Sequence, residues 1–374
     1  MDTLSKLQLL SDASRYDLSC ACGTKSPEDH RTRGDNGTWL YPVVRPDGGT
    51  SIMLKTLMSN ACVNDCKYCP FRATMDTPRC SLTPDETASL FMKYLYAKSL
   101  FGIFLTSGVI GSPDKTMAIL NDTARILRNK HAYRGYIHIK VIPGASNDAI
   151  DDALSLASAV SINIETPGQH RLAHLSVKKK FQNDIIRPLT YICGRTSNGG
   201  RFERVKQTTQ FIVGASDETD SEIVKYTEGL YRKLRLHRVY YSAYQHGLGD
   251  RGIPGERIVQ ENSDVSFMRE HRLYQVDFLF RKYHFNLSDI YFNEHGSLSL
   301  KTDPKQVWAD RHPEFYPVNI NRADINVLLH VPGIGPVMAK RILKMREGNS
   351  IGDMDWLPVK GKRLETIKKY AVSS

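Results

Sequence analysis

The sequence contains no apolar run approaching the ~20 residues that a membrane-spanning helix needs. Cysteine is scarce, with seven in 374 residues. The N-terminal segment carries early acidic residues and has no long apolar core of the kind found in secretory signals. We therefore expect neither a membrane partner nor a disulfide framework, and we predict a protein of the reducing cytoplasm.

Composition is otherwise ordinary, with 41% hydrophobic and 24% charged residues, as in soluble globular proteins. The length predicts one large domain with a small appendage. The net charge of +11 is localised. Residues 171–206 have a net charge of +7 and residues 318–374 a net charge of +5. This distribution favours a polyanionic partner, although a charge run such as Lys178-Lys179-Lys180 is usually a solvated surface.

Three cysteines lie within eight residues, Cys62, Cys66 and Cys69, in a C-x3-C-x2-C spacing with Tyr68 before the last. A loop this short can turn all three side chains towards one centre. Cysteine thiolates are the usual ligands of iron–sulfur clusters, and a cubane cluster has four irons. A structural zinc site would need a fourth ligand, commonly from a second cysteine pair, and none lies nearby. Three ligands leave one iron open for a substrate or cofactor.

The other four cysteines are less informative. Cys20 and Cys22 form a C-x-C pair. They either ligate a second metal, cap the first cluster, or are two small residues in a tight segment. Cys80 and Cys193 are expected to be packed thiols.

Short apolar segments alternate with amphipathic ones from residue 51 onward. Thr83-Pro84-Asp85-Glu86 predicts a helix start with a capping box and proline in the first turn. We expect strands at 51–59, 101–106, 135–142, 160–164, 207–213 and 237–244, with helices near 83–98, 112–129, 147–157, 217–234 and 265–283. This order predicts an α/β fold in which parallel βα units with right-handed crossovers form an incomplete barrel. Its active site would lie at the carboxyl ends of the strands.

We divide the chain into an N-terminal extension with loop character (1–50), the partial barrel (51–285), a connector (286–317) and a small all-α domain (318–374). In the last of these, Gly333-Ile334-Gly335 lies between two short helices. The glycines let backbone N–H groups point outward at the start of the second helix, where the helix dipole favours a phosphate. Ile334 would pack inward, while Lys340 and Arg341 add charge one turn later.

The Gly-Ile-Gly segment and its flanking helices resemble the helix-hairpin-helix DNA-binding motif. A second, degenerate copy is expected at Leu357-Pro358-Val359-Lys360-Gly361-Lys362-Arg363. Such paired units bind the duplex backbone without reading sequence. The alternative is a protein–protein docking module, against which the local net charge of +5 argues.

The cysteine spacing, with Tyr68 in its place, resembles the cluster motif of the radical S-adenosylmethionine (SAM) superfamily. The resemblance implies a six-stranded partial (β/α)6 barrel with a 4Fe-4S cluster on the loop after the first strand. It also implies that SAM chelates the open iron, that a reductant such as flavodoxin or ferredoxin supplies an electron, and that reductive cleavage yields a 5′-deoxyadenosyl radical. That radical would abstract a hydrogen atom from the substrate.

The resemblance also implies positions that contact SAM. Ser107 and Gly108 match the turn after the second strand that receives the SAM amine, although the acidic residue usual there is missing. The alternative is a plain strand-to-helix turn. Asn163 and Glu165, which alternate onto one face of the fourth strand, match positions that contact the ribose or carboxylate.

Two further positions correspond to the adenine end of SAM. Tyr68 resembles the aromatic that packs on adenine, and Gly214 would let the backbone approach it. Tyr241, Tyr244 and Cys193 are candidates for quenching or relaying the radical only because their chemistry permits it.

A radical SAM barrel followed by a helix-hairpin-helix resembles a family of radical SAM proteins associated with DNA modification or repair, and with a uracil-DNA-glycosylase-like partner. The resemblance covers residues 40–374 and implies radical chemistry on DNA. Basic residues of 171–206 would then guide a nucleic-acid strand to the barrel mouth. The alternatives are radical SAM chemistry on RNA and a non-catalytic iron–sulfur DNA-binding protein.

Overall fold

The computed structural model describes residues 1–14, 39–44, 49–257 and 263–373. The chain divides into two compact units. Unit 1 comprises Met1–Glu218 and Gly229–Phe267, and unit 2 comprises Thr219–Glu228 and Met268–Ser374. No helix in the described ranges combines the length and the apolar character needed to cross a membrane.

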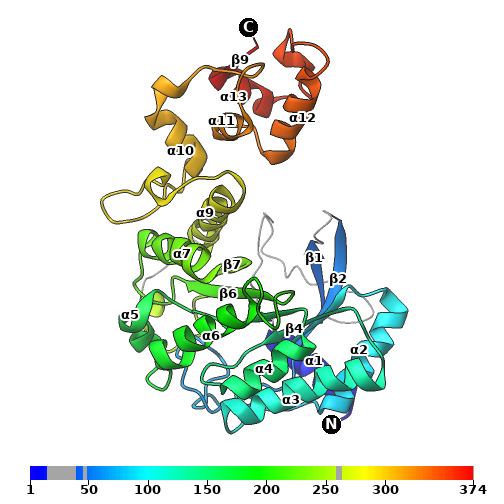
Figure 1. Ribbon diagram of the computed structural model, residues 1–374. Helices are drawn as coiled ribbons and strands as arrows, with labels where there is room; N and C mark the ends of the chain where they lie inside the picture. The colour runs from blue at the N-terminus through cyan, green and yellow to red at the C-terminus, as the bar shows by residue number, and fades with distance from the viewer. Residues whose placement is uncertain (15–38, 45–48, 258–262, 374) are drawn as a thin grey trace. The chain divides into compact units, whose positions relative to one another are not determined.

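Unit 1 is built on one seven-stranded sheet whose strands follow one another in chain order (Figure 1). The strands are β1 (Leu40–Val44), β2 (Thr50–Leu57), β3 (Gly102–Thr106), β4 (Tyr136–Lys140), β5 (Ala159–Ser161), β6 (Lys206–Val213) and β7 (Arg238–Ala243). Strands β2 to β7 are parallel, and β1 pairs antiparallel with β2. The six predicted strands and the partial α/β barrel are confirmed.

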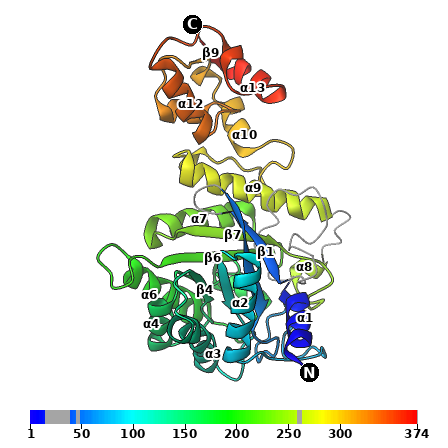
Figure 2. The same cartoon turned by 90° about the vertical axis from the view of Figure 1, so that its right-hand side faces the viewer.

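Helices follow most strands of the sheet. They are α2 (Pro84–Lys98), α3 (Pro113–Arg125), α4 (Asn147–Leu156), α5 (Gly168–Leu175), α6 (Arg187–Thr196), α7 (Asp220–Leu234) and α8 (Pro254–Arg257). Of these, α3, α4 and α6 lie together on one side of the sheet (Figure 2). The capping box at Thr83 is confirmed: its side chain accepts the Glu86 amide, and the Glu86 carboxylate accepts the Thr83 amide. Local capping therefore sets where the first barrel helix begins.

One segment expected to be irregular contains regular structure. The N-terminal extension includes α1 (Thr3–Ser14) and β1, so the prediction of loop character is wrong there. Strand β1 is short and contains Pro42, which hides it from propensity rules because proline is confined to sheet edges. The basic stretch 171–206 holds most of α5, all of α6 and the π-helical turn Phe181–Ile186.

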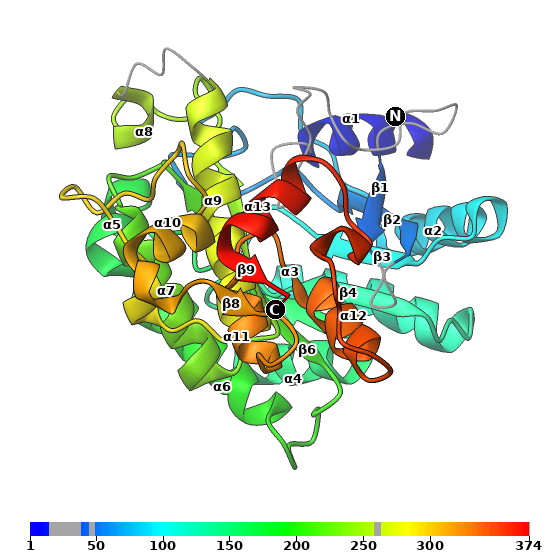
Figure 3. The same ribbon diagram turned by 90° about the horizontal axis from the view of Figure 1, so that it is seen from above.

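Unit 2 is mainly helical (Figure 3). Its main elements are α9 (Ser263–Lys282, shared with unit 1), α10 (Pro304–Arg311), α11 (Ile325–His330), α12 (Pro336–Arg346), α13 (Lys362–Tyr370) and the short parallel pair β8 (Val318–Asn319) with β9 (Ala371–Val372).

Aromatic packing joins the expected connector to the C-terminal helices. Trp308 on α10 stacks on His312 with ring centroids 4.4 Å apart and lies 4.7 Å from the ring of His330 at the end of α11. Phe285 stacks on His330 at 4.4 Å and meets the edge of Trp308 at 5.7 Å. Residues 286–317 thus share a core with the C-terminal helices, while the three boundaries between the four predicted segments stay a prediction.

Candidate active site and nucleic-acid interface

The three cysteines lie on the loop that follows β2, as expected from the sequence. Together with the carboxyl ends of the strands they line one cavity of about 190 Å³. The loop is tied to the next βα connection, because the Val63 amide donates to the Val109 carbonyl at 3.0 Å. Cys62, Cys66 and Cys69 are therefore brought to the same end of the barrel, where parallel βα proteins have their active sites.

Backbone amides point at two of the sulfur atoms. Cys62 Sγ accepts the amides of Asn64 and Val109 at 3.4 and 3.3 Å, and Cys69 Sγ accepts the amide of Phe71 at 3.4 Å. Hydrogen bonds of this kind stabilise thiolates that ligate iron–sulfur clusters and tune their potentials. The donor set therefore fits a cluster.

Burial raises the pKa of the Cys66 thiol and raises the pKa of Cys69 to about 12. Metal binding at these thiols would accordingly release protons. In the described part of the chain, no three His, Cys, Asp or Glu side chains gather around a single ion. A cubane cluster does not require that, because each thiolate binds a different iron.

Asp65, inside the cysteine loop, anchors it to the segment after α5. Its carboxylate accepts the Ser176 hydroxyl at 2.5 Å and the Val177 amide at 2.8 Å. The Lys67 amide donates to the Leu175 carbonyl at 2.8 Å beside them. These hydrogen bonds hold the cysteine loop against the end of α5 and the residues that follow it. Sequence reasoning missed Asp65, although an acidic residue inside a cysteine motif is a usable signal for such a clamp.

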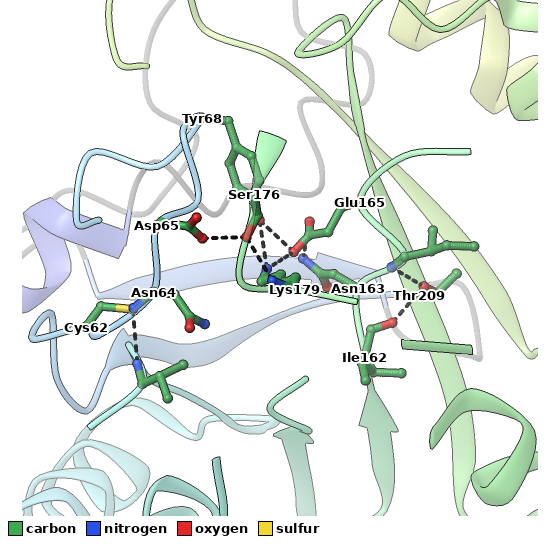
Figure 4. A network of polar contacts seen from close by, with 12 residues as sticks. Cys62, Asn64, Asp65, Tyr68, Ile162, Asn163, Glu165, Ser176, Lys179 and Thr209 are labelled. Carbon is green, nitrogen blue, oxygen red and sulfur yellow. Dashed lines mark hydrogen bonds and ion pairs between the residues drawn. The ribbon is translucent and has the colours of Figure 1, made fainter. Parts of the chain in front are cut away.

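A buried group of three polar side chains lies between the cysteine loop and the end of β5 (Figure 4). Glu165 Oε1 accepts the Tyr68 hydroxyl at 2.7 Å and the Lys179 ammonium at 3.0 Å. The Lys179 ammonium also lies 3.1 Å from the Tyr68 oxygen. We call Tyr68, Glu165 and Lys179 the buried triad. Its carboxylate and ammonium are less than a tenth exposed, so each charge depends on the other.

The electrostatics of the buried triad follow from that pairing. Burial alone would lower the pKa of Lys179, but the Cys66 thiolate and Glu165 raise it above its usual value. Burial, reinforced by negative charge on Cys66 and Glu165, raises the pKa of Tyr68 well above its usual value. Lys179 is thus a fixed positive charge and Tyr68 a neutral donor. The backbone of Glu165 has φ +65°, which a non-glycine residue adopts at a cost that concentrates at functional sites.

Lys179 corrects the interpretation of its charge run. The prediction that Lys178-Lys179-Lys180 guides a nucleic-acid strand is wrong for Lys179, which is 7% exposed and bonded inside the site. Lys178 and Lys180 are exposed and donate to the Val63 and Val177 carbonyls, respectively. No periodicity distinguishes the middle lysine, since its burial comes from the tertiary fold.

Ser107 and Gly108 lie beside the cysteine loop, as predicted. The Ser107 hydroxyl is buried, lines the cavity and has no hydrogen-bond partner in the described residues. A Cβ at Gly108 would lie 2.4 Å from the Ala61 carbonyl oxygen, so only glycine lets this turn approach the loop. A buried hydroxyl without a partner costs free energy unless a ligand satisfies it. This site therefore fits a polar cofactor bound next to the cysteines.

Of the other two positions predicted to contact SAM, Asn163 and Gly214, one lines the cavity and the other does not. Asn163 lines the cavity and lies 3.5 Å from Glu165 Oε2. Gly214 is not among the cavity-lining residues; it has φ +89° and its amide donates to Glu218. Its contact with adenine stays a prediction. Two lining residues that sequence reasoning missed are Lys140, at the end of β4, and Gln210, on β6.

The loop after β7 closes one side of the cavity around a single carboxylate. Glu256 accepts the Tyr244 hydroxyl and the amides of Gly247 and Gly249, the last at 2.9 Å. These hydrogen bonds lower the pKa of Glu256 against the opposing effect of burial. The Asp250 amide donates to the Lys67 carbonyl at 2.7 Å, so this loop also holds the cysteine loop.

The radical-relay candidates are placed differently from one another. Tyr244 lines the cavity, whereas Tyr241 and Cys193 do not. Tyr241 is fully buried and stacks on Phe211, with ring centroids 6.1 Å apart. Cys80 and Cys193 are partly buried, and burial raises the pKa of each thiol. Cys20 and Cys22 lie outside the described residues.

In unit 2 the predicted hairpin joins α11 to α12. Gly333 has φ +85°, Ile334 is 1% exposed, and Gly335 is the residue from which α12 begins. Ile334 thus packs inward as predicted. Lys340 and Arg341 are exposed on α12. Their contact with DNA stays a prediction.

Two cationic side chains hold the hairpin carbonyls. Arg363 Nε donates to the Gly333 carbonyl at 2.8 Å, and Lys305 Nζ donates to the Ile334 carbonyl at 2.5 Å. A Cβ at Gly333 would lie 2.7 Å from Ile367 Cγ1, so the hairpin packs tightly against α13. The hairpin is therefore a braced structure and not a free loop.

The expected second copy is present in outline. The 3₁₀ turn Met354–Trp356 leads through Leu357 to Gly361, which has φ +60°, and α13 begins at Lys362. Gly361 precedes α13 as Gly335 precedes α12. Lys360, at the position of the buried Ile334, is exposed, which explains why the copy looks degenerate.

Comparison with known proteins found matches of two kinds. Residues 314–357 match the family model described as a helix-hairpin-helix motif. Among solved structures, methylornithine synthase (PylB) is 16% identical, with a TM-score of 0.44 over 58% of this chain and 61% of that one. The FeFe-hydrogenase maturase HydG from Carboxydothermus hydrogenoformans is 14% identical, with a TM-score of 0.42 over 83% and 80% of the two chains.

A third structure, the cobalamin-dependent S-adenosylmethionine radical enzyme OxsB, is 13% identical with a TM-score of 0.34, over 82% of this chain and 50% of that one. The chain thus spans about three fifths of methylornithine synthase and half of OxsB. The search of curated proteins found no match. Residues 314–357 contain a helix-hairpin-helix motif, as the sequence indicated.

Proposed function

We propose that the chain is a radical SAM enzyme that acts on DNA. The radical SAM part of this proposal is supported by three thiols that line one cavity at the carboxyl ends of a partial barrel. That cavity also contains the unpartnered hydroxyl of Ser107. The helix-hairpin-helix motif at residues 314–357 supports action on DNA.

Cys62, Cys66 and Cys69 would hold a 4Fe-4S cluster, and Ser107, Asn163 and Glu165 would contact SAM. When bound, such a cluster would supply the electron for reductive cleavage of SAM to methionine and a 5′-deoxyadenosyl radical, the species that would take hydrogen from the substrate. The protein's share is binding, orientation and exclusion of competing reactions.

Residues around the cavity provide this orientation by holding the cysteine loop in place. Asp65 holds it from α5, the Asp250 amide holds it from the loop after β7, and the buried triad holds Tyr68 against β5. Glu165 is satisfied by Tyr68 and Lys179, so the cavity gains no unbalanced negative charge from it. A loop braced on three sides keeps cofactor and substrate in a fixed relation, which is the main protein contribution to such reactions.

The nucleic-acid half of the proposal rests on charge and geometry in unit 2. Both hairpins end at a glycine from which a helix begins, and Lys340 and Arg341 are exposed on the first of these helices. Helix N-termini with outward amides bind phosphates. Phosphate binding of this kind is independent of sequence and weakens steeply with salt.

The test is anaerobic incubation of the reconstituted full-length protein with SAM and dithionite, measuring 5′-deoxyadenosine with and without nucleic acid. The proposal predicts cleavage that duplex DNA stimulates more than structured RNA of equal length. Stimulation by RNA alone would move the substrate to RNA. Absence of deoxyadenosine from cluster-loaded protein would leave a non-catalytic iron–sulfur DNA-binding protein. The reductant, the glycosylase-like partner and the cytoplasmic location stay predictions from the resemblance.

A further inference from the structure

Two carboxamides form part of the cavity wall on adjacent strands. Asn163 follows β5 and Gln210 lies on β6, and both line the cavity. The register Ser161↔Thr208 and the bond from the Glu165 amide to the Gln210 carbonyl place them side by side. Side chains two residues apart on a strand share one face, so Asn163 shares a face with Glu165, and Gln210 shares a face with Ile212. Asn163 and Gln210 each lie one such step further from the carboxyl ends of the strands, and therefore deeper in the barrel. We call Asn163 and Gln210 the carboxamide floor.

The carboxamide floor is buried but has few partners. Asn163 is 7% exposed and Gln210 is 8% exposed. Asn163 has one side-chain contact, at 3.5 Å to Glu165, which is at the limit for a hydrogen bond. The Gln210 side chain makes no hydrogen bond to any residue that the structure describes. Neither residue has a side-chain atom among the buried, unpartnered polar atoms of the described residues, and both residues line the cavity. A carboxamide has two N–H donors and a carbonyl acceptor, which a ligand in the cavity can meet.

The surrounding charges restrict that ligand. Among the described residues that line the cavity, Glu165 is the one acidic residue. Its carboxylate is already paired with Lys179. Lys140, on the strand next to β5, also lines the cavity. A cationic ligand would meet no unpaired carboxylate among these lining residues, so the cavity favours a neutral ligand. The edge of a nucleobase offers adjacent donors and acceptors, and asparagine and glutamine side chains form paired hydrogen bonds with such an edge.

We propose that the carboxamide floor binds the edge of a nucleobase that has been extruded from its strand into the barrel. This proposal rests on the proposed function and names its substrate: the base is what the radical reaches. Asn163, which the proposed function also assigns to SAM, would be shared between cofactor and base, whereas Gln210 would contact the base alone. Enzymes that modify bases commonly extrude them and recognise the base edge in a closed pocket. Gln210 supplies most of the recognition, because its side chain has no other partner.

The experiment measures nucleotide binding without catalysis. Full-length protein with its cluster, saturated with SAM and without reductant, is titrated with the deoxynucleoside 5′-monophosphates of A, G, C, T, U and 8-oxoguanine, and binding is followed by calorimetry. SAM occupies its own adenine site, so that site cannot account for the signal. Wild type is compared with Gln210→Ala, with the isosteric Gln210→Glu, and with Gln182→Ala. Gln182 is exposed and matches the first change in size.

The proposal predicts that at least one nucleotide binds and that Gln210→Ala weakens it about tenfold or more, since a bidentate base contact discriminates by that amount. Gln210→Glu should change which nucleotide binds best, because it exchanges two donors for an acceptor. Gln182→Ala should match wild type. Cluster absorbance and circular dichroism show that each variant is folded.

Two results would overturn the inference. One is equal nucleotide affinity in wild type and both Gln210 variants. The other is no nucleotide binding by a protein that still releases deoxyadenosine when DNA is added, which would leave the proposed function standing. Failure to cleave SAM under reducing conditions would instead overturn the proposed function itself.

Discussion

In each unit of the molecule a buried lysine is bonded to the functional element, and these two lysines, Lys179 and Lys305, have opposite surroundings. Lys179 in unit 1 is 7% exposed and Lys305 in unit 2 is 8% exposed. Lys179 meets a carboxylate, Glu165, at 3.0 Å, and its pKa is raised. Lys305 meets the Ile334 carbonyl and the face of Tyr283, 4.7 Å from the ring centroid.

No carboxylate in the described part of the chain is bonded to Lys305, and burial lowers its pKa to about 7. Asp303 opposes the shift, and Arg363 adds to it. Burial alone therefore does not define a lysine's role. The lysine of the cysteine site is a permanent charge, whereas the lysine of the hairpin titrates near neutral pH.

The largest expected effect is the loss of the reaction in unit 1 while duplex binding by unit 2 is kept. Replacing Cys62, Cys66 or Cys69 with Ala should remove the cluster and abolish deoxyadenosine formation. Duplex affinity should stay within about twofold of wild type, because the hairpin is held by unit 2 residues alone. Iron content, deoxyadenosine yield and fluorescence anisotropy check this. A Cys66→Ala protein with full iron content would contradict the assignment, and Cys193→Ala, outside the cavity, is the control.

Next is the paired lysine. Lys179→Met should lower the free energy of unfolding by about 3–5 kcal/mol, because it leaves the Glu165 carboxylate buried without its cation. The double variant Lys179→Met/Glu165→Gln should recover part of the loss. Urea unfolding of cluster-free protein measures both.

The matched control for Lys179→Met is the exposed neighbour Lys178→Met, for which we expect a change below about 0.5 kcal/mol. Equal effects of the two single substitutions would show that the buried pair is not what stabilises the site.

Lys305 should make the stability of unit 2 depend on pH. Its pKa is about 7 in the folded protein and near 10.5 when unfolded, so between these values the unfolded state binds more protons. The free energy of unfolding should therefore rise with pH above 7, at most by about 1.4 kcal/mol per pH unit. The neighbouring groups are Asp303, Arg363, Tyr283 and His330.

Urea unfolding at pH 6.5 to 9 checks the pH dependence as a difference between wild type and Lys305→Met. The variant should lose this part of the slope, and Lys301→Met, an exposed lysine four residues earlier, should keep it. Identical slopes in all three proteins would show that Lys305 keeps an ordinary pKa.

The smallest effect concerns exposed charge. Lys340→Gln/Arg341→Gln should reduce the slope of log affinity against log salt by about two, because each phosphate contact contributes about 0.9. Affinity should fall similarly for all duplex sequences. Anisotropy titrations between 50 and 200 mM salt measure the slope. An unchanged slope would place the phosphate contacts elsewhere on the protein.

Much of the fold could be predicted because its signals are local. Strand and helix periods, the Thr83 capping box and the Gly-Ile-Gly hairpin lie within short segments, and each was confirmed. Strand β1 was missed because it is short and contains Pro42, and proline disfavours a strand. Lys179 and Gln210 could not be identified for a different reason. Their roles depend on which strands are neighbours, and that is set by the tertiary fold.

The most direct test of the account is the deoxyadenosine yield of the reconstituted protein with SAM and dithionite, with and without duplex DNA. The account predicts SAM cleavage that requires Cys62, Cys66 and Cys69 and rises when duplex DNA is added. A cluster-loaded protein that binds the duplex but releases no deoxyadenosine under either condition would contradict it.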